Sequence, residues 1–145
     1  MTVASQLPRV TTVAPSRAVL YGLLAVAALS VGGAVISVAG DLSPSLLDAM
    51  GPDGRLSIPL PMMVAQVALA FAAGSPRRAV ALIGSGLLAA ALLAGVVSGF
   101  FDGGYADDRL TAVERVYQVT FVGTLAVVGV MAARRFWQVL RSTSA

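Results

Sequence analysis

Four stretches of apolar residues without any charge organise this chain, and short polar connections separate them. The stretches cover residues 18–40, 58–73, 79–101 and 116–133. At about 1.5 Å per residue, a helix over 79–101 is about 34 Å long, enough to cross the hydrocarbon core of a bilayer. The stretch at 58–73 is shorter, and the residues just before it can extend it. The pattern predicts membrane helices at about 18–40, 57–73, 79–101 and 112–140.

Capping residues mark two further helix ends. Thr111 followed by Glu114 fits a capping box at the start of the fourth helix. In the first connection, Ser43 precedes a proline, and Gly51 stops the chain before another proline. This pattern predicts two helical turns over 44–50, with an apolar side that rests on the membrane surface.

The connections between the stretches are short, so each helix is expected to run antiparallel to the one before it. We therefore predict an all-α polytopic membrane protein, an antiparallel four-helix transmembrane bundle, in which every backbone polar group is satisfied within a helix. One domain at 18–141 follows a flexible tail at 1–17 and precedes a short tail at 142–145. The first stretch also has signal-peptide features, namely preceding arginines and small residues at 37–39. It is longer than a typical signal core, which favours an uncleaved helix and leaves cleavage as the alternative.

Composition agrees with a membrane protein and excludes several chemistries. The chain is 57% hydrophobic and 12% charged, with a mean hydropathy of +0.86. It has no Cys, no His and no Lys. A Cys/His zinc site, a thiolate nucleophile, a Ser-His-Asp triad and a lysine Schiff base are thereby excluded, and no cofactor is expected. The net charge of +3 comes from residues at the ends of the apolar stretches rather than from one basic face, so no nucleic-acid partner is expected.

The arginines predict the orientation of the bundle. The two tails and the connection between the second and third helices contain no acid, whereas the other two connections and the start of the fourth helix contain all 7 acidic residues. The arginines on the acid-free side are Arg9, Arg17, Arg77, Arg78, Arg134, Arg135 and Arg141. Because arginine excess marks the cytoplasmic side, both termini are expected in the cytoplasm. Arginine in place of lysine, with abundant Ala, Gly and Val, is typical of a G+C-rich bacterial genome, so the membrane is predicted to be a bacterial plasma membrane.

Few polar side chains lie inside the predicted helices. Gln66 in the second and Gln118 in the fourth both fall roughly 10–12 Å below the outer helix ends by residue count. In an up-and-down bundle these helices are diagonal neighbours. We therefore expect the two amides to meet at one level, with Tyr117 beside them, as a polar core or a ligand contact.

Small side chains recur on the third helix. Ala91, Gly95 and Gly99 are four residues apart and form one stripe. Such a stripe lets another backbone approach closely, so we expect a helix-packing seam, with Gly95 and Gly99 facing another helix.

An acidic cluster is predicted on the outer side, made of Asp102, Asp107, Asp108 and Glu114. Its spacing does not fit an EF-hand, and no metal site is expected. The simplest interpretation is that these acids keep the loops in water and help to set topology, with Asp102 pairing with Arg109 or Arg115.

These features favour a structural or accessory membrane protein without enzymatic activity. Its partners would be the lipid bilayer and a second protein, or another copy of the chain, bound through helix faces. One alternative is a small transporter or ligand-binding membrane module with its site between the second and fourth helices. Another is an enzyme at the outer leaflet that uses the loop carboxylates.

Overall fold

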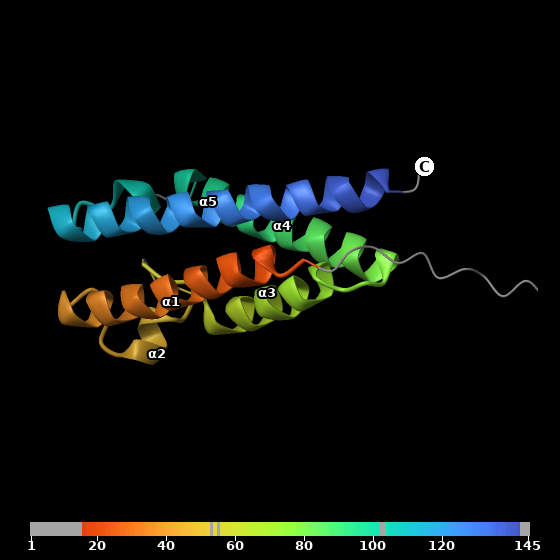
Figure 1. Cartoon of the computed structure of the whole chain (residues 1–145). Helices are drawn as coiled ribbons and strands as arrows, with labels where there is room; N and C mark the ends of the chain where they lie inside the picture. The colour runs from red at the N-terminus through yellow and green to blue at the C-terminus, as the bar shows by residue number, and fades with distance from the viewer. Residues whose placement is uncertain (1–15, 53, 55, 102–103, 143–145) are drawn as a thin grey trace, which may run out of the picture.

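The computed structural model describes residues 16–52, 54, 56–101 and 104–142, and within these ranges it is all-helical, with no strand. Figure 1 shows the main helices lying side by side, with a short helix beneath the first. The elements are α1 (Ala18–Ala39), α2 (Leu46–Ala49), α3 (Leu60–Ala73), α4 (Arg78–Phe101), the 3-10 turn η1 (Gly104–Ala106) and α5 (Ala112–Arg141).

The long helices surround a common apolar core. α1 packs against α3 and α5, and α4 packs against the same two helices, whereas α3 and α5 touch each other only sparsely. The core contains Leu23 and Val26 from α1, Leu88 and Leu92 from α4, and Phe121 from α5. The sparse contact between α3 and α5 leaves room for the groove described below.

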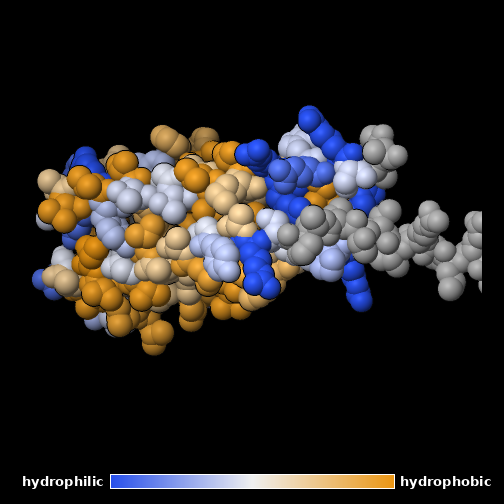
Figure 2. All heavy atoms as spheres, in the orientation of Figure 1, coloured by the Kyte–Doolittle hydropathy of each residue, from blue (hydrophilic) through white to orange (hydrophobic). Residues whose placement is uncertain are grey.

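Three of the helices have the length and composition of membrane-spanning segments. α1, α4 and α5 are long and apolar enough to cross a bilayer, and α3 is a shorter apolar helix. Large apolar side chains also cover the outside: Phe71, Ile83 and Val127 are all more than half exposed. Figure 2 shows this apolar surface around the body of the molecule, with hydrophilic side chains gathered at the end where α5 finishes. Such a surface is typical of a protein embedded in a membrane.

The start of α3 differs from the expected start at 57. The helix begins at Leu60, and residues 56–58 before it are buried and non-helical. The amide of Ile58 donates to Ser30 Oγ in α1 at 2.8 Å, the hydroxyl of Ser57 donates to the carbonyl of Ala49, and the amide of Leu60 donates to the carbonyl of Met50 at 2.9 Å. The amides of Ile58 and Leu60 thereby have partners outside the helix, which lowers the cost of burying non-helical backbone.

α2 is also shorter than the two turns expected over 44–50. It covers only Leu46–Ala49, and its N-cap is Ser45, whose hydroxyl oxygen accepts from the amide of Asp48 at 3.2 Å. Ser43 therefore does not cap this helix. The capping box at α5 is confirmed, since Thr111 Oγ1 accepts from the Glu114 amide while Glu114 Oε2 accepts from the Thr111 amide at 2.7 Å.

A candidate ligand-binding groove between α3, α4 and α5

A groove of about 480 Å³ runs between α3, α4 and α5 beneath the connection that precedes α3. This volume falls in the range of small-molecule sites in proteins. We call it the interhelical groove. Its lining includes Met62 and Gln66 from α3, Ala91, Leu92, Gly95, Ser98 and Gly99 from α4, Tyr105 from η1, and Gln118, Phe121 and Leu125 from α5.

The small residues of α4 create much of this space. Ala91, Gly95 and Gly99 all line the groove. A Cβ added to Gly95 would meet nothing within 4 Å, whereas one added to Gly99 would lie 2.3 Å from the ring of Tyr105. The stripe thus borders open space at Gly95 and an aromatic ring at Gly99. This differs from the close helix contact that the sequence predicts for both glycines.

Gln66 has the most unusual environment in the groove. It is only 3% exposed, and its Oε1 atom has no hydrogen-bond partner among the described residues. Burying an amide oxygen without a donor costs about 1–3 kcal/mol. A molecule in the groove that donates a hydrogen bond would remove this cost.

Gln118 also lines the groove and is 5% exposed, but it lies at another depth. Figure 1 shows α3 and α5 running in the same direction, and Arg135 Nε of α5 donates to the carbonyl of Ala73 at the end of α3. The contact between Ala73 and Arg135 defines a common level on the two helices. Measured from it towards the helix N-termini at about 1.5 Å per residue, Gln66 lies about 10 Å away along α3 and Gln118 about 25 Å away along α5. The two amides therefore stand about 15 Å apart along the bundle, and the expected single polar layer is absent at these residues.

The cause of this offset is the buried segment before α3. Ile58 is bonded to Ser30, which lies well inside α1, so α3 starts deep in the bundle rather than at its outer end. Counting residues from the start of the apolar stretch placed Gln66 too close to the outer surface. The groove is consequently long, with Gln66 at its deep end and Gln118 nearer the outer end.

Tyr117 points to α1. Its hydroxyl donates to the carbonyl of Leu29, and the same oxygen lies 2.7 Å from where a Cβ on Gly32 would be. Tyr117 is not part of the groove lining, although the sequence places it beside Gln118. Its bond instead joins α5 to α1.

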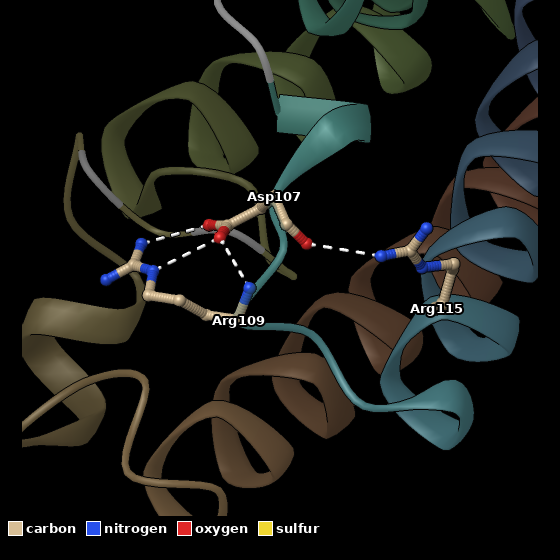
Figure 3. Close-up of polar contacts among 3 residues, drawn as sticks. All are labelled: Asp107, Arg109 and Arg115. Carbon is tan, nitrogen blue, oxygen red and sulfur yellow. Dashed lines mark hydrogen bonds and ion pairs between the residues drawn. The ribbon is translucent and has the colours of Figure 1, made fainter.

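The acidic residues between α4 and α5 and at the start of α5 are engaged in separate local contacts. Asp107 binds the guanidinium of Arg109 at 2.9 and 3.1 Å, and Arg115 donates to the backbone carbonyl of Asp107 at 3.4 Å (Figure 3). The hydrogen bonds and the charge of Asp107 raise the pKa of Arg109. Glu114 is buried in its capping box.

The acidic cluster therefore does not assemble as one site in the part of the chain that the structure describes. Asp108 is exposed, and Asp102 lies outside the described residues, so its pairing with Arg109 or Arg115 stays a prediction. No group of three or more acidic side chains within the described ranges is arranged to hold a metal ion.

Tyr105 is a groove residue that the sequence pattern does not indicate. Its hydroxyl donates to the carbonyl of Val96 at 2.5 Å, and its ring meets that of Phe100 edge-on, with centroids 4.8 Å apart. Its side chain thereby covers Gly99 at the outer end of the groove. A lone tyrosine in a polar connection gives no pattern by which this position could be found.

No protein-family model, curated protein or solved structure matches this chain, so its function is inferred from the groove and its two amides.

Proposed function

We propose that the chain is a multi-pass protein of a bacterial plasma membrane, folded as an antiparallel four-helix transmembrane bundle. α3 is the shortest proposed span, because its 14 residues give a helix of only about 21 Å. The buried residues 56–58 precede it inside the bundle, where the carbonyl of Leu56 lies close to Gly33 of α1. The packing of α3 against both α1 and α4 supports a fourth crossing.

The orientation follows from the charges. Arg17, Arg77, Arg134 and Arg141 are exposed at the end of the molecule that holds both described termini. The salt-bridged Asp107 and the exposed Asp108 lie in the connection between α4 and α5. Positive residues favour the cytoplasmic side, so both termini are placed in the cytoplasm.

Within this bundle, the proposed function is the binding of a small molecule in the interhelical groove. The observation that carries it is the buried Oε1 atom of Gln66, which finds no donor among the described residues and belongs to a side chain that lines the groove. A purely structural or accessory role gives no reason to keep such an oxygen without a donor in a residue of the groove lining. Catalysis by the loop carboxylates is not favoured, because Asp107 and Glu114 are engaged by Arg109 and Thr111 away from the groove.

Native mass spectrometry of the protein released from its own membranes tests this function. The wild type should carry a bound small molecule, and Gln66→Met should reduce its occupancy about tenfold, because methionine keeps the unbranched shape but removes the acceptor. Gln138→Met, the same change at an exposed position of α5, should leave occupancy unchanged. A wild type without any bound molecule, or equal occupancy in all three proteins, would contradict the proposal.

A further inference from the structure

We infer that the molecule bound in the interhelical groove is an uncharged long-chain membrane lipid with a free hydroxyl group, which enters sideways from the bilayer and donates its hydrogen bond to Gln66. This inference rests on the proposed function and adds the chemical class of the ligand and its route. It follows from four properties of the groove: its charge, its shape, its acceptor and its opening.

The described lining around Gln66 offers no partner to a charged ligand. Among the described residues that form the groove, none is an Asp, a Glu or an Arg. A carboxylate, phosphate or ammonium group in this space would lose its hydration without gaining an opposite charge, which is strongly unfavourable. The ligand is therefore neutral at the depth of Gln66.

The shape of the groove fits a chain rather than a compact ring system. Gln66 and Gln118 mark levels about 15 Å apart along the bundle, given a rise of about 1.5 Å per helical residue. Between them the walls are apolar, made by Leu92, Phe121 and Leu125, which are all buried. An extended hydrocarbon chain covers this distance while it contacts apolar side chains on both sides.

The acceptor at the deep end selects the polar group of the ligand. A carbonyl oxygen only accepts hydrogen bonds, so its partner must carry an O–H or N–H donor. An ether, ketone or ester without a hydroxyl has no donor. The free-energy cost of the unpaired Oε1 of Gln66 would then be the same as in the empty groove. Among neutral membrane lipids, the common donor is a hydroxyl group.

The opening of the groove faces the apolar outside of the molecule. Met62, Gly95 and Ser98 line the groove and are also exposed. They lie on α3 and α4, whose outer surfaces are covered by apolar side chains such as Val64 and Val97. In a membrane these surfaces contact lipid, so a lipid reaches the groove without passing through water.

The test uses three photoreactive sixteen-carbon probes that differ only in the end group: a primary alcohol, its methyl ether and the carboxylic acid. Each carries a diazirine in the chain, and each is added to the full-length protein in phosphatidylcholine nanodiscs. We expect the alcohol to label groove-lining peptides of α4 and α5 about tenfold more than the ether does. An excess of unlabelled hexadecanol should compete with this labelling.

Two variants test whether labelling by the alcohol depends on the acceptor Oε1 of Gln66. Gln66→Met should lower alcohol labelling of the groove to the level of the ether and leave ether labelling unchanged, whereas Gln138→Met should change neither. If the ether or the acid labels the groove as strongly as the alcohol, the hydroxyl class is wrong while the ligand site stands. If all three probes label only exposed lipid-facing peptides, the lipid ligand is wrong. The mass spectrometry of the previous section then shows separately whether the groove binds any molecule.

Discussion

The Nε atom of Arg135 lies 3.3 Å from the carbonyl oxygen of Ala73, the last residue of α3. The final carbonyls of a helix have no partner within the helix and carry partial negative charge, so a guanidinium there is favourable. Arg78 plays the same part for α5, since it donates to the carbonyls of Val139 and Leu140 at 3.4 Å. Two of the arginines that predict topology therefore also join helix ends.

Arg135→Met should destabilise the protein by about 1.5–3 kcal/mol, because a charged hydrogen bond is lost and the Ala73 carbonyl is left with fewer donors. Arg135 is only 8% exposed, whereas its neighbour Arg134 is exposed, so Arg134→Met should cost less than about 0.5 kcal/mol. Unfolding in a mild detergent, followed by circular dichroism, measures both. Equal stability of the two variants would show that the Arg135 bond contributes nothing.

The sequence predicted the long helices well because their signal is simple. Uncharged stretches bounded by charge or glycine give α1, α4 and α5 to within about one residue of the structure, and the Thr111 capping box was identified correctly. These features depend on residues that are close in the chain. The same holds for the arginine pattern, whose topological meaning stays a prediction.

The parts that the sequence did not predict depend on contacts between distant residues. An apolar stretch has the same composition whether it is helical or buried without helical structure, so nothing local indicated that residues 57–59 lie outside the helix and that Ile58 bonds to Ser30. That single long-range bond sets the depth of α3 and thereby separates Gln66 from Gln118. For the same reason the glycine stripe was identified on α4, but the open space beside Gly95 was not.

Gly33 should tolerate no side chain, because the buried segment before α3 passes directly over it. A Cβ at this position would lie 1.8 Å from the carbonyl oxygen of Leu56, which is backbone and cannot rotate away. Gly33→Ala should therefore displace the segment and destabilise the protein by about 1–3 kcal/mol.

Gly123→Ala is the matched control for Gly33→Ala. A Cβ at Gly123 meets nothing within 4 Å, and alanine favours the helix by up to about 1 kcal/mol over glycine. Thermal unfolding of the two variants in detergent compares them directly. The close approach of Leu56 would be refuted if Gly33→Ala were as stable as Gly123→Ala.

Cysteine labelling checks the orientation, since the native chain contains no cysteine. Ser5→Cys and Ser142→Cys should be protected from a membrane-impermeant maleimide in intact cells, and Ala106→Cys, an exposed position in η1, should react. Permeabilised cells serve as the control, because both protected positions should then react. Labelling at position 142 in intact cells would reverse the proposed orientation.

Gly95→Leu distinguishes a helix-packing seam from a ligand groove. If Gly95 faced another backbone, leucine would force the helices apart. The structure instead shows no atom within 4 Å of a Cβ at this position, so the leucine side chain should enter the groove and leave the melting temperature unchanged or slightly higher. Gly84→Leu should lower it strongly, because a Cβ there would lie 2.6 Å from the amide nitrogen of Ala73.

The same variant also reports on the ligand. A leucine that occupies the groove removes space for the bound molecule, so native mass spectrometry should show occupancy falling at least tenfold while the protein stays folded. This combination, unchanged stability with lost binding, is specific to a groove that holds a ligand. Unchanged stability with unchanged occupancy would place the bound molecule elsewhere. Lost stability would instead mean that α4 meets another helix at Gly95, as the small-residue pattern alone predicts.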